Sequence, residues 1–541
     1  MGAPSRLTEV VTSDETSAFG RWRSAVNVQL TDLKSPPKPT LGDVIAGLSV
    51  ALVVIPQSLA YAGLAGLPPV LGLFAAAFPL LIFAVFASSP YLQTGPVALT
   101  SLLTAGALAG AGLEAETSAY IGAAAILALI VGVIRLLLGL GRLGSIVYVM
   151  AEPVTMGFTS GAGIVILSSQ LPRALGVTLP AEVADRANPI SRALWSLMNP
   201  GEWTSGALVI SAITLFFMLQ GKKIHRLFPG VLVAVIVSLA YSRIVDYNGP
   251  VIPDIEPGLP TWSLDLPWSS TGSLIVGGIV IALVGFAEPA SIARHFANEE
   301  QSHWSSSREF FASGLANIVA GVTGAYPVGG SFSRSSVNRF AGAETRASGA
   351  ITGVVVLAFL PFTFLLDRLP EAVLGAIVVG AVLSLVKPRR MIGLRSRSKW
   401  QASLAWITFV ATLLTPPNVQ YAVIIGVLLT VAYHVFRPFH IDAESTTEGL
   451  HLRLRGLLWM GTLTKLNTEL VKAIENDAGS GPITVSLDRS TAIDSSIAQS
   501  IAAGREAAER AGRLFVVVNP PFGAEPILAN YDIEVEAVET V

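Results

Sequence analysis

The sequence predicts a polytopic α-helical membrane protein with a small soluble α/β domain at its C-terminus. Of the 541 residues, 52% are hydrophobic and only 13% are charged, whereas about a quarter of the residues of a soluble protein are charged. The apolar residues gather in repeated runs, each long enough to cross about 30 Å of hydrocarbon. Soluble core helices do not explain such repetition, so most of the chain is expected to lie in a lipid bilayer.

Composition also excludes several classes of protein. The net charge of −2 gives no electrostatic basis for a nucleic-acid partner. The absence of cysteine excludes disulfides, thiolate metal sites and cysteine nucleophiles. The six histidines show no metal-ligand spacing, and the sequence contains no phosphate loop or nucleophile triad. We therefore expect no enzymatic activity, no metal and no cofactor.

The chain is expected to contain three parts. Residues 1–40 are polar and are predicted to form a cytosolic N-terminal segment. They do not resemble a cleaved signal peptide, because the first apolar run starts only at Gly42. Residues 41–438 are predicted to form the transmembrane domain. The apolar runs stop there, and residues 439–541 are predicted to form the soluble domain.

Fourteen candidate membrane segments follow one another in the predicted transmembrane domain. The third and the tenth are short and polar at their starts, so they are predicted to be half-helices that begin inside the membrane. The fourteen segments centre near residues 54, 77, 101, 128, 161, 211, 236, 282, 317, 335, 357, 379, 406 and 428.

The loops between these segments follow the positive-inside rule. With the N-terminus inside, the even-numbered loops should collect lysine and arginine, whereas the odd loop at 243–271 carries four acidic residues against one arginine. Fourteen spans with both termini cytoplasmic satisfy this pattern and place the protein in the cell membrane. The cations assigned to even-numbered loops are Arg135, Arg142, Lys222, Lys223, Arg226, Arg294, Arg308, Arg339, Arg346, Lys387, Arg389, Arg390, Arg395, Arg397 and Lys399.

The predicted soluble domain has the pattern of an α/β unit. Apolar and basic residues alternate over 452–455, as in a half-buried strand, and the apolar runs at 483–487 and 514–518 indicate further strands. Residues 497–508 carry the apolar stripe of a helix, which is expected to stop at Gly512.

Matched breaks indicate that the transmembrane domain consists of seven-plus-seven inverted repeats. The first segment is predicted to break at Pro56 and the eighth at Pro289. The third opens at Gly95 and the tenth at Gly330, and both pairs are offset by nearly the same number of residues. Secondary transporters commonly combine inverted repeats with broken helices and bind their substrate at the repeat interface.

The two half-helices predict an anion site between them. A helix that begins near the midplane leaves its first N–H groups unpaired and its positive dipole end exposed, which favours an anion without many charged residues. The alternative is that these glycines and serines only allow close helix packing. The predicted site residues are Thr94, Gly95, Pro96, Val97 and Ala98 at the first half-helix, and Gly330, Ser331, Phe332, Ser333 and Arg334 at the second.

Three polar side chains have individual predictions. Glu288 lies in an otherwise apolar segment, where a charged carboxylate costs about 2.5–3.5 kcal/mol, so it is predicted to be protonated, paired or titrating as a coupling group. The alternative is a structural partner of a nearby backbone N–H or of Arg334. Arg334 is predicted to attract the anion, to compensate Glu288, or both. Gln57 offers donor and acceptor groups to a ligand, or repairs the backbone at the predicted break.

At these residues the sequence resembles the sulfate permease family, the bacterial and plant relatives of solute carrier family 26. The resemblance runs from about residue 41 to residue 541. The motifs that carry it, in the order of the family, are GDVIAGLSVALVVIPQSLAYAGLAGLPPVLGLF at 42–74, TGPVALTSLL at 94–103, GFTSGAGIVILSSQL at 157–171, GFAEPASIAR at 285–294 and GLANIVAGVTGAYPVGGSFSRSSVN at 314–338.

The resemblance implies the fold shared with uracil permeases. In that fold a core domain, segments 1–4 and 8–11, moves against a gate domain, segments 5–7 and 12–14, in an elevator-like motion. It further implies an anion held between the third and tenth half-helices, with Gln57 nearby, and a cation-coupling role for Glu288. Relatives that use sodium often carry aspartate at that position, so the glutamate favours a proton over sodium.

The C-terminal part resembles a STAS domain, named for sulfate transporters and anti-sigma factor antagonists. The resemblance rests on the strand at 483–487 and on AIDSS at 492–496, which opens a helix. In the antagonists the serine after the aspartate is phosphorylated, which corresponds to Ser495. The alternative is that Asp494 and Ser495 cap the helix. Family members are commonly homodimers, so a homodimer is expected.

Three functions compete at this point. The first is a secondary active anion transporter by proton-coupled symport, with sulfate the default substrate and bicarbonate or a dicarboxylate such as fumarate the close alternatives. The second is an anion channel or voltage-responsive motor. The third is a nucleobase permease of the same fold, against which Arg334 and the appended STAS-like domain argue.

Overall fold

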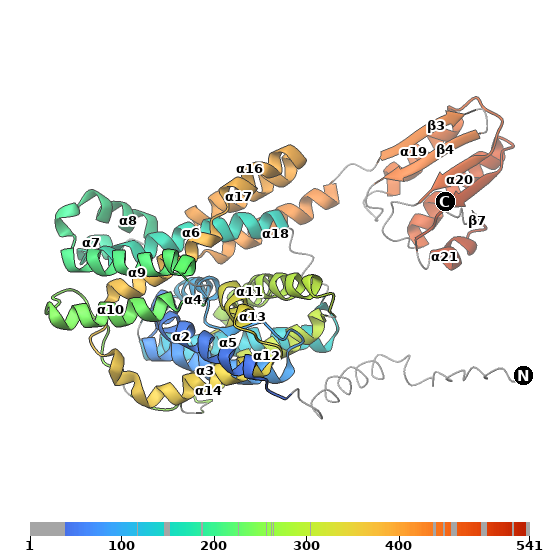
Figure 1. The fold of residues 1–541 in the computed structure, drawn as a ribbon. Coiled ribbons are helices and arrows are strands. Elements are labelled where there is room, and N and C mark those ends of the chain that lie inside the picture. Colours follow the sequence, from blue (N-terminus) through green and yellow to red (C-terminus); the bar gives the residue numbers. More distant parts are fainter. Residues whose placement is uncertain are drawn as a thin grey trace, which may run out of the picture. The chain divides into compact units, whose positions relative to one another are not determined.

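The computed structural model describes the chain from Lys38 to Glu536 with short gaps. The described residues are 38–115, 117–144, 152–185, 188–224, 227–255, 257–260, 262, 264–302, 304–436, 440–446, 449–455, 463–487, 495–521 and 524–536. The predictions for Asp494 and for most of the N-terminal segment lie outside these residues. The chain divides into two units, Met1–Val427 and Leu428–Val541, and Figure 1 shows their elements.

The first unit is built almost wholly of helices, and each of the fourteen predicted segment centres falls inside one of them. The last, α18, runs across the boundary between the units. The helices are α2 (Leu41–Leu64), α3 (Pro69–Phe86), α4 (Ala98–Gly110), α5 (Ser118–Leu140), α6 (Glu152–Leu175), α7 (Ala181–Ala184), α8 (Pro189–Met198), α9 (Ser205–Ile224), α10 (Gly230–Ile244), α11 (Thr271–Glu299), α12 (Ser306–Val322), α13 (Phe332–Phe340), α14 (Ala347–Phe359), α15 (Glu371–Val382), α16 (Pro388–Arg397), α17 (Lys399–Leu414) and α18 (Gln420–Phe436).

Short elements complete the first unit. Two strands of two residues each precede the half-helices α4 and α13, and 3₁₀ turns connect several of the longer helices. They are β1 (Thr94–Gly95), β2 (Gly329–Gly330), η2 (Pro200–Glu202), η3 (Trp268–Ser270), η4 (Leu360–Leu366) and η5 (Leu383–Leu385).

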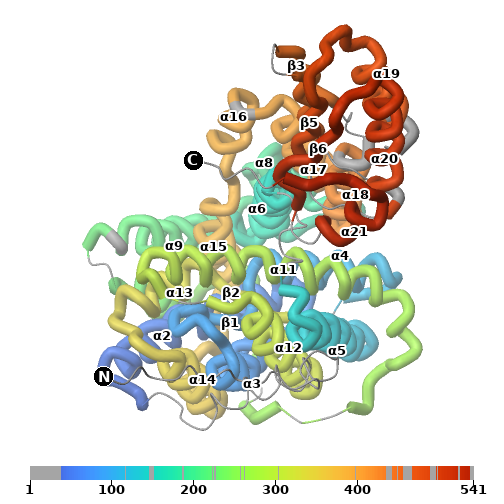
Figure 2. Tube along the Cα trace, turned by 90° about the vertical axis from the view of Figure 1, so that its right-hand side faces the viewer, coloured from blue at the N-terminus to red at the C-terminus, as the bar shows by residue number. Residues whose placement is uncertain are grey.

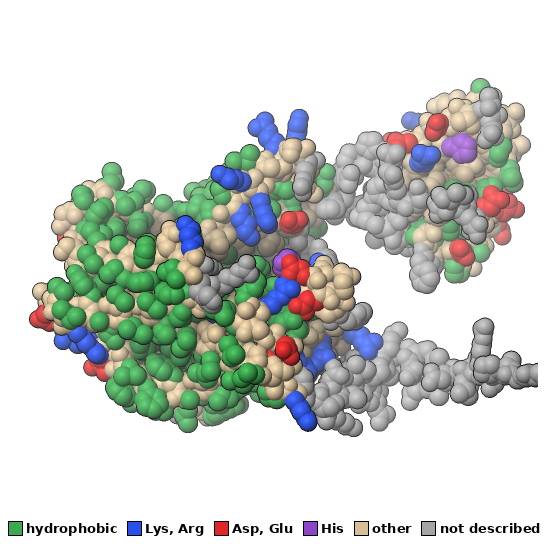
Figure 3. All heavy atoms as spheres, in the orientation of Figure 1, with side chains coloured by type: hydrophobic (Ala, Val, Ile, Leu, Met, Phe, Trp, Pro, Cys, Tyr) green, Lys and Arg blue, Asp and Glu red, His purple; other side chains and the backbone are tan. Residues whose placement is uncertain are grey.

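Seven helices among the described residues are long and apolar enough to cross a membrane. Shorter apolar helices, α4, α9, α10 and α18, accompany them, and the total of fourteen spans stays a prediction. Large apolar side chains stand on the outside of this unit, such as Phe216 (57% exposed) and Ile244 (83% exposed). Figure 3 shows hydrophobic side chains over most of the visible face of the helical unit, as a lipid environment requires.

The helices pack in two groups (Figure 2). The first group is α2, α3, α4, α5, α11, α12, α13 and α14, and the second is α6, α8, α9, α10, α15, α16 and α17. Helix α2 meets the second group mainly at α10 and α15. The first group contains the segments of the core domain that the family resemblance implies, and the second contains those of the gate domain except the fourteenth, α18.

Small residues bring α5 and α12 into close contact inside the first group. A Cβ on Gly314 would lie 2.5 Å from the backbone nitrogen of Leu136, and one on Gly132 would lie 2.7 Å from that of Ile318. The two backbones therefore touch, as they do at small-residue interfaces of membrane helices.

The predicted breaks in the first and eighth segments are wrong. Helix α2 continues through Pro56, and α11 continues through Pro289. A proline inside a helix removes one hydrogen bond to the carbonyl four residues earlier. Packing of both helices inside the bundle compensates for that loss, so the helices stay continuous.

The second unit is a five-stranded sheet with helices, which confirms a small α/β unit. The strand order is β3-β4-β5-β6-β7, with β3 antiparallel to β4 and the other neighbours parallel. Alternating residues of β5 and β6 are buried against α19 and α20. The elements are β3 (His440–Thr446), β4 (Gly449–Arg455), α19 (Leu463–Glu475), β5 (Ile483–Ser486), α20 (Ser495–Arg510), β6 (Phe515–Val518), α21 (Glu525–Ala529) and β7 (Glu534–Glu536).

Candidate functional site

Two short strands bring the predicted site segments together. Thr94 pairs with Gly330 and Gly95 with Gly329 in antiparallel register. The hydroxyl of Thr94 donates to the carbonyl of Gly329 at 3.2 Å, and the N–H of Ser331 donates to the carbonyl of Gln93 at 3.0 Å. Residues 235 positions apart thus lie side by side (Figure 2), and α4 and α13 start from the same place.

The two half-helices begin differently. At α13 the side chain of Ser331 accepts the backbone N–H of Arg334, so this end is capped by its own chain. At α4 the N-cap is Val97, whose side chain makes no capping hydrogen bond. An uncapped helix start carries about half a positive charge on its free N–H groups. The start of α4, at Ala98, is therefore the end that favours an anion.

Arg334 is the central cation of this arrangement. Its side chain is fully buried, and its Nη1 donates to the carbonyl of Pro96 at 2.7 Å. Its Nε and Nη2 have no hydrogen-bond partner among the described residues. Gly95 has φ +139°, and a Cβ there would lie 3.4 Å from Nη2. A side chain at position 95 would thus crowd the free edge of the guanidinium.

Further buried polar side chains lie near Arg334 or on α2, which packs on α13. Gln57 is 3% exposed, and its Oε1 accepts no hydrogen bond from the described residues. The hydroxyls of Ser101 and Tyr326 are also buried and lie within hydrogen-bonding reach of each other. Tyr61 and Tyr326 lie close enough to Arg334 to interact with its charge. Sequence reasoning missed Ser101, Tyr61 and Tyr326. The position of Tyr61 was the signal available, because it lies one helical turn after Gln57 on the same face of α2.

Phe332 and Ser333 lie farther from this centre. Phe332 is 51% exposed and its ring stacks on that of Phe296 in α11, with centroids 6.4 Å apart. Ser333 is exposed, and its hydroxyl lies 3.3 Å from that of Ser331. The structure therefore gathers the buried polar members of the predicted set and leaves these two at its edge.

Glu288 lies on α11 immediately before Pro289. A Cβ on Gly330 would lie 3.0 Å from Pro289, so this turn of α11 packs directly on β2. Among the described residues the carboxylate forms no ion pair, and the charges that act on it are those of Lys387 and Arg334. Arg334 binds the carbonyl of Pro96 rather than this carboxylate. Glu288 and Arg334 therefore interact through their charges without forming an ion pair in the described part of the chain, and compensation between them stays a prediction.

Arg135 corrects the assignment of this residue to a cytosolic loop. It lies inside α5 and is fully buried. Its guanidinium donates to the carbonyls of Ile281 (2.9 Å), Ala282 (3.1 Å) and Val328 (3.0 Å), and to the hydroxyl of Ser313 (2.9 Å). Among the described residues it has no carboxylate partner, so it adds an uncompensated positive charge beside β2.

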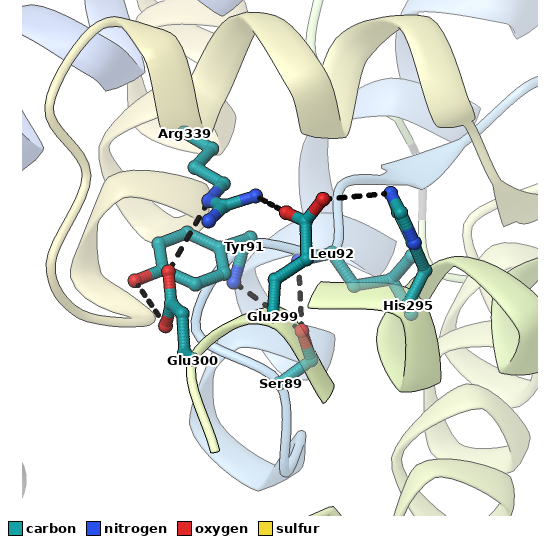
Figure 4. A network of polar contacts seen from close by, with 7 residues as sticks. All are labelled: Ser89, Tyr91, Leu92, His295, Glu299, Glu300 and Arg339. Atoms are coloured by element: carbon teal, nitrogen blue, oxygen red, sulfur yellow. Dashed lines mark hydrogen bonds and ion pairs between the residues drawn. The ribbon is translucent and has the colours of Figure 1, made fainter. Parts of the chain in front are cut away.

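A polar network ties together the ends of the elements that carry the site (Figure 4). Arg339 of α13 binds Glu299 and Glu300 at the end of α11, and Tyr91 donates its hydroxyl to Glu300 at 2.8 Å. The hydroxyl of Ser89 accepts the N–H groups of Tyr91 and Leu92. The segment that leads into β1 is therefore anchored to α11 and α13.

Solved structures show that the fold is a known one. The overall structure of SLC26A9 matches with a TM-score of 0.82 at 18% sequence identity, covering 98% of this chain and 94% of that one. The transmembrane domain of a cyanobacterium bicarbonate transporter, BicA, matches with a TM-score of 0.61 at 21% identity, covering 72% and 97%. At this identity the likeness establishes the helical transporter fold.

Sequence comparison establishes the family. Sulfate transporter 4.1, chloroplastic, of Arabidopsis thaliana is 32% identical over 412 residues, which cover 74% of this chain and 58% of that protein. A protein of Mycobacterium tuberculosis named as a probable sulfate transporter is 33% identical over 412 residues, which are 71% of its length. The model of the sulfate permease family matches residues 41–408. The chain belongs to the sulfate permease family, a family of anion transporters of the membrane.

Proposed function

We propose that the chain is a secondary active transporter that carries sulfate with a proton by an elevator-like motion. The single observation that carries the substrate assignment is the buried guanidinium of Arg334 with two donors free, beside the uncapped start of α4. Membership of the sulfate permease family makes sulfate the first substrate to test.

The geometry of Arg334 suits an oxyanion. The free Nε and Nη2 share one edge of the guanidinium, and two parallel N–H donors on that edge match two oxygens of a sulfate or carboxylate. The N–H groups at Ala98 and the hydroxyls of Ser101 and Tyr326 add donors without charge. A neutral nucleobase needs no such cation, so this arrangement supports an anion over the nucleobase alternative.

The charge balance also supports an anion. Arg334 and Arg135 are both fully buried and lack carboxylate partners among the described residues. Buried cations without counterions are costly in a low-dielectric interior. A doubly charged oxyanion between α4 and α13 would relieve that cost.

Glu288 supports coupling to a proton. An ionised carboxylate near the site would repel an arriving anion, and protonation removes this repulsion. Because the neutral form of Glu288 and the bound anion favour each other, the two are expected to move together. This linkage requires neither sodium coupling nor anion exchange. The uptake experiment tests both as alternatives.

The packing of the half-helices supports the elevator-like motion. Both α4 and α13 belong to the first helix group, and β1, β2 and the Arg334–Pro96 hydrogen bond connect them within it. The site would therefore move as one body when the first group slides against the second. Helix α2, which contacts α10 and α15, is the expected sliding surface.

The second unit is proposed to be a STAS domain with a regulatory role. Ser495 is exposed at the first position of α20, where a phosphate would face the positive end of the helix. A homodimer in the membrane is part of the same proposal. Mass measurement of the detergent-solubilised chain tests the dimer, and phosphopeptide mapping at Ser495 tests the modification.

Tracer uptake into proteoliposomes tests the function. We expect saturable sulfate uptake that increases with an inward proton gradient, and weaker uptake of bicarbonate and fumarate. Uptake of bicarbonate or fumarate in preference to sulfate would replace the substrate. Large conductance without coupling would favour the channel alternative. If none of the three anions is carried, the proposed function is wrong.

A further inference from the structure

A cavity lies along the later turns of α4, beyond the residues that surround Arg334. It has a volume of about 620 Å³, and none of its lining residues belongs to the set around Arg334. One water occupies about 30 Å³ of liquid, so this cavity has room for an anion with much of its hydration shell. The first helix group contributes the end of α2, the later turns of α4 and the start of α5, and the second contributes α6, α8 and α15.

The cavity lies at the end of the helices opposite the basic helix α16. It is lined by the last turns of α6, the first residue of α15, and Val419 just before α18. Helix α15 runs 12 residues from there towards α16. At about 1.5 Å per residue, α15 alone separates the two ends by about 18 Å. We call this cavity the distal vestibule.

The charges of the distal vestibule do not balance. Arg173 pairs with Glu371 at 3.4 Å and also reaches the carbonyl of Gly63 at 3.5 Å. Arg192 is half-buried, and its guanidinium has no ion-pair or hydrogen-bond partner among the described residues. Burial and the positive charge of Arg173 both lower the pKa of Arg192. The side chains of Arg173, Arg192 and Glu371 therefore carry a net charge of one positive unit.

The start of α8 lies at the same space. Pro189 is the first residue of this ten-residue helix and lines the vestibule, and Arg192 follows one turn later. Asn188 caps the helix by accepting the N–H of Ile190, so the free positive charge here is that of the Arg192 guanidinium. A free guanidinium beside a cavity that admits several waters favours a hydrated anion.

We propose that the distal vestibule is a second anion site, in which an oxyanion such as sulfate is held by Arg192 and Arg173 on its way to or from Arg334. The proposal rests on the function proposed above. It adds the residues that the anion passes at one face of the membrane. Because Glu371 neutralises Arg173, Arg192 supplies the decisive charge. The site is expected to concentrate the anion rather than to bind it tightly, since its cation is half-exposed.

The absence of natural cysteine allows a direct test. In the full chain, Arg192→Cys introduces one thiol into the vestibule, and membrane-impermeant methanethiosulfonates attach either a trimethylammonium or a sulfonate group to it. We expect Arg192→Cys to raise the KM for sulfate roughly 3- to 10-fold at low ionic strength for transport from the vestibule side. The cationic label should restore the KM, and the anionic label should raise it further.

Protection from labelling reports binding without transport. Millimolar sulfate should slow modification of the introduced thiol several-fold, while sodium gluconate at equal ionic strength should not. The matched control is Arg395→Cys on α16, an exposed arginine at the opposite end, whose labelling should be indifferent to sulfate. Arg192→Lys should keep the wild-type KM, which separates loss of charge from loss of fold.

Each outcome decides the proposal. Equal effects of the cationic and anionic labels, or labelling that sulfate does not slow, would overturn the distal site. A KM raised equally for transport from both faces would assign Arg192 a structural role instead. Sulfate protection in a protein that transports no sulfate would keep the distal site and refute the proposed transport function. If the wild-type chain takes up no sulfate and sulfate does not slow labelling of Arg192→Cys, both the transport function and the distal site are refuted.

Discussion

The helical unit and the α/β unit treat buried arginine in opposite ways. In the α/β unit, Arg513 is 7% exposed and binds Asp477 at 2.8 Å, so its charge is neutralised within the fold. In the helical unit, Arg135 and Arg334 are fully buried and have no carboxylate partner in the described part of the chain. A fold that leaves two buried cations without counterions keeps positive charge available for a mobile anion.

The two arginines of the helical unit also differ from each other. All three guanidinium nitrogens of Arg135 donate to protein oxygens, whereas Arg334 uses only Nη1. Arg135 therefore holds α5, α11 and the residue before β2 together. Nε and Nη2 of Arg334 have no protein partner in the described part of the chain, which fits the proposed contact with an anion. This difference predicts that one substitution mainly affects stability and the other mainly affects affinity.

The largest effect is expected for Arg334→Gln. Loss of two charge-assisted hydrogen bonds, each worth about 1.5–3 kcal/mol, should weaken sulfate binding by roughly 100-fold or more. The melting temperature should change little, because only the bond to Pro96 is lost from the fold. Isothermal titration of sulfate and thermal unfolding in detergent check both halves. An unaltered sulfate affinity would return Arg334 to a structural role.

Arg135→Met should show the reverse pattern. It leaves buried carbonyls without their donor, and we expect a loss of about 2 kcal/mol or more in stability. Sulfate affinity should fall by less than in Arg334→Gln, because Arg135 acts on the anion only through its charge. Thermal unfolding measures the first effect, with Arg395→Met at the surface as control. A variant as stable as the wild type would contradict the structural role that distinguishes Arg135 from Arg334.

Glu288→Gln should separate binding from coupling. The amide cannot ionise, so sulfate exchange should persist while the stimulation of uptake by an inward proton gradient disappears. Uptake measured with and without a proton gradient, alongside counterflow at symmetrical pH, checks this. The coupling role is refuted if the variant still accumulates sulfate in response to the gradient.

The smallest effect is expected in the α/β unit. Hydrogen bonds from Ser445 and Arg513 hold the pKa of Asp477 below its usual value of 3.8. This carboxylate therefore stabilises the unit above that pH, and the contribution is lost as the pH falls through the lower folded value. Asp477→Asn should reduce hydrogen-exchange protection of β6 a few-fold near pH 7 in the full chain. Protection that is unchanged near pH 7 would contradict this.

Sequence reasoning predicted that the two half-helices meet, because the local chemistry of their starts is distinctive. Gly95, Pro96 and the serines around Arg334 mark helix starts within apolar surroundings, and their matched spacing pointed to a pair. Sequence reasoning was wrong about helix breaks at Pro56 and Pro289, because a proline in the sequence indicates only that one backbone hydrogen bond is missing. Whether the helix then breaks depends on neighbouring helices, which the local sequence does not describe.

Other residues escaped sequence reasoning for related reasons. Arg135 lies near the end of an apolar run, where a cation can reach the membrane surface or turn inward to carbonyl groups, and only packing decides between them. Strand β3 carries mostly exposed polar residues, so it lacks the alternation that marked β4. Arg173 and Arg192 come from separate helices, and no spacing in the chain reveals that they share a cavity.

The pairing of β1 with β2 bears on how the protein is made. A nascent chain that ends before Gly329 has inserted α4 but lacks the strand that holds its start in place. The proposed anion site therefore forms only after the second repeat has entered the membrane and folded back onto the first. Its completion late in biogenesis would keep an unfinished chain from conducting anions across the membrane.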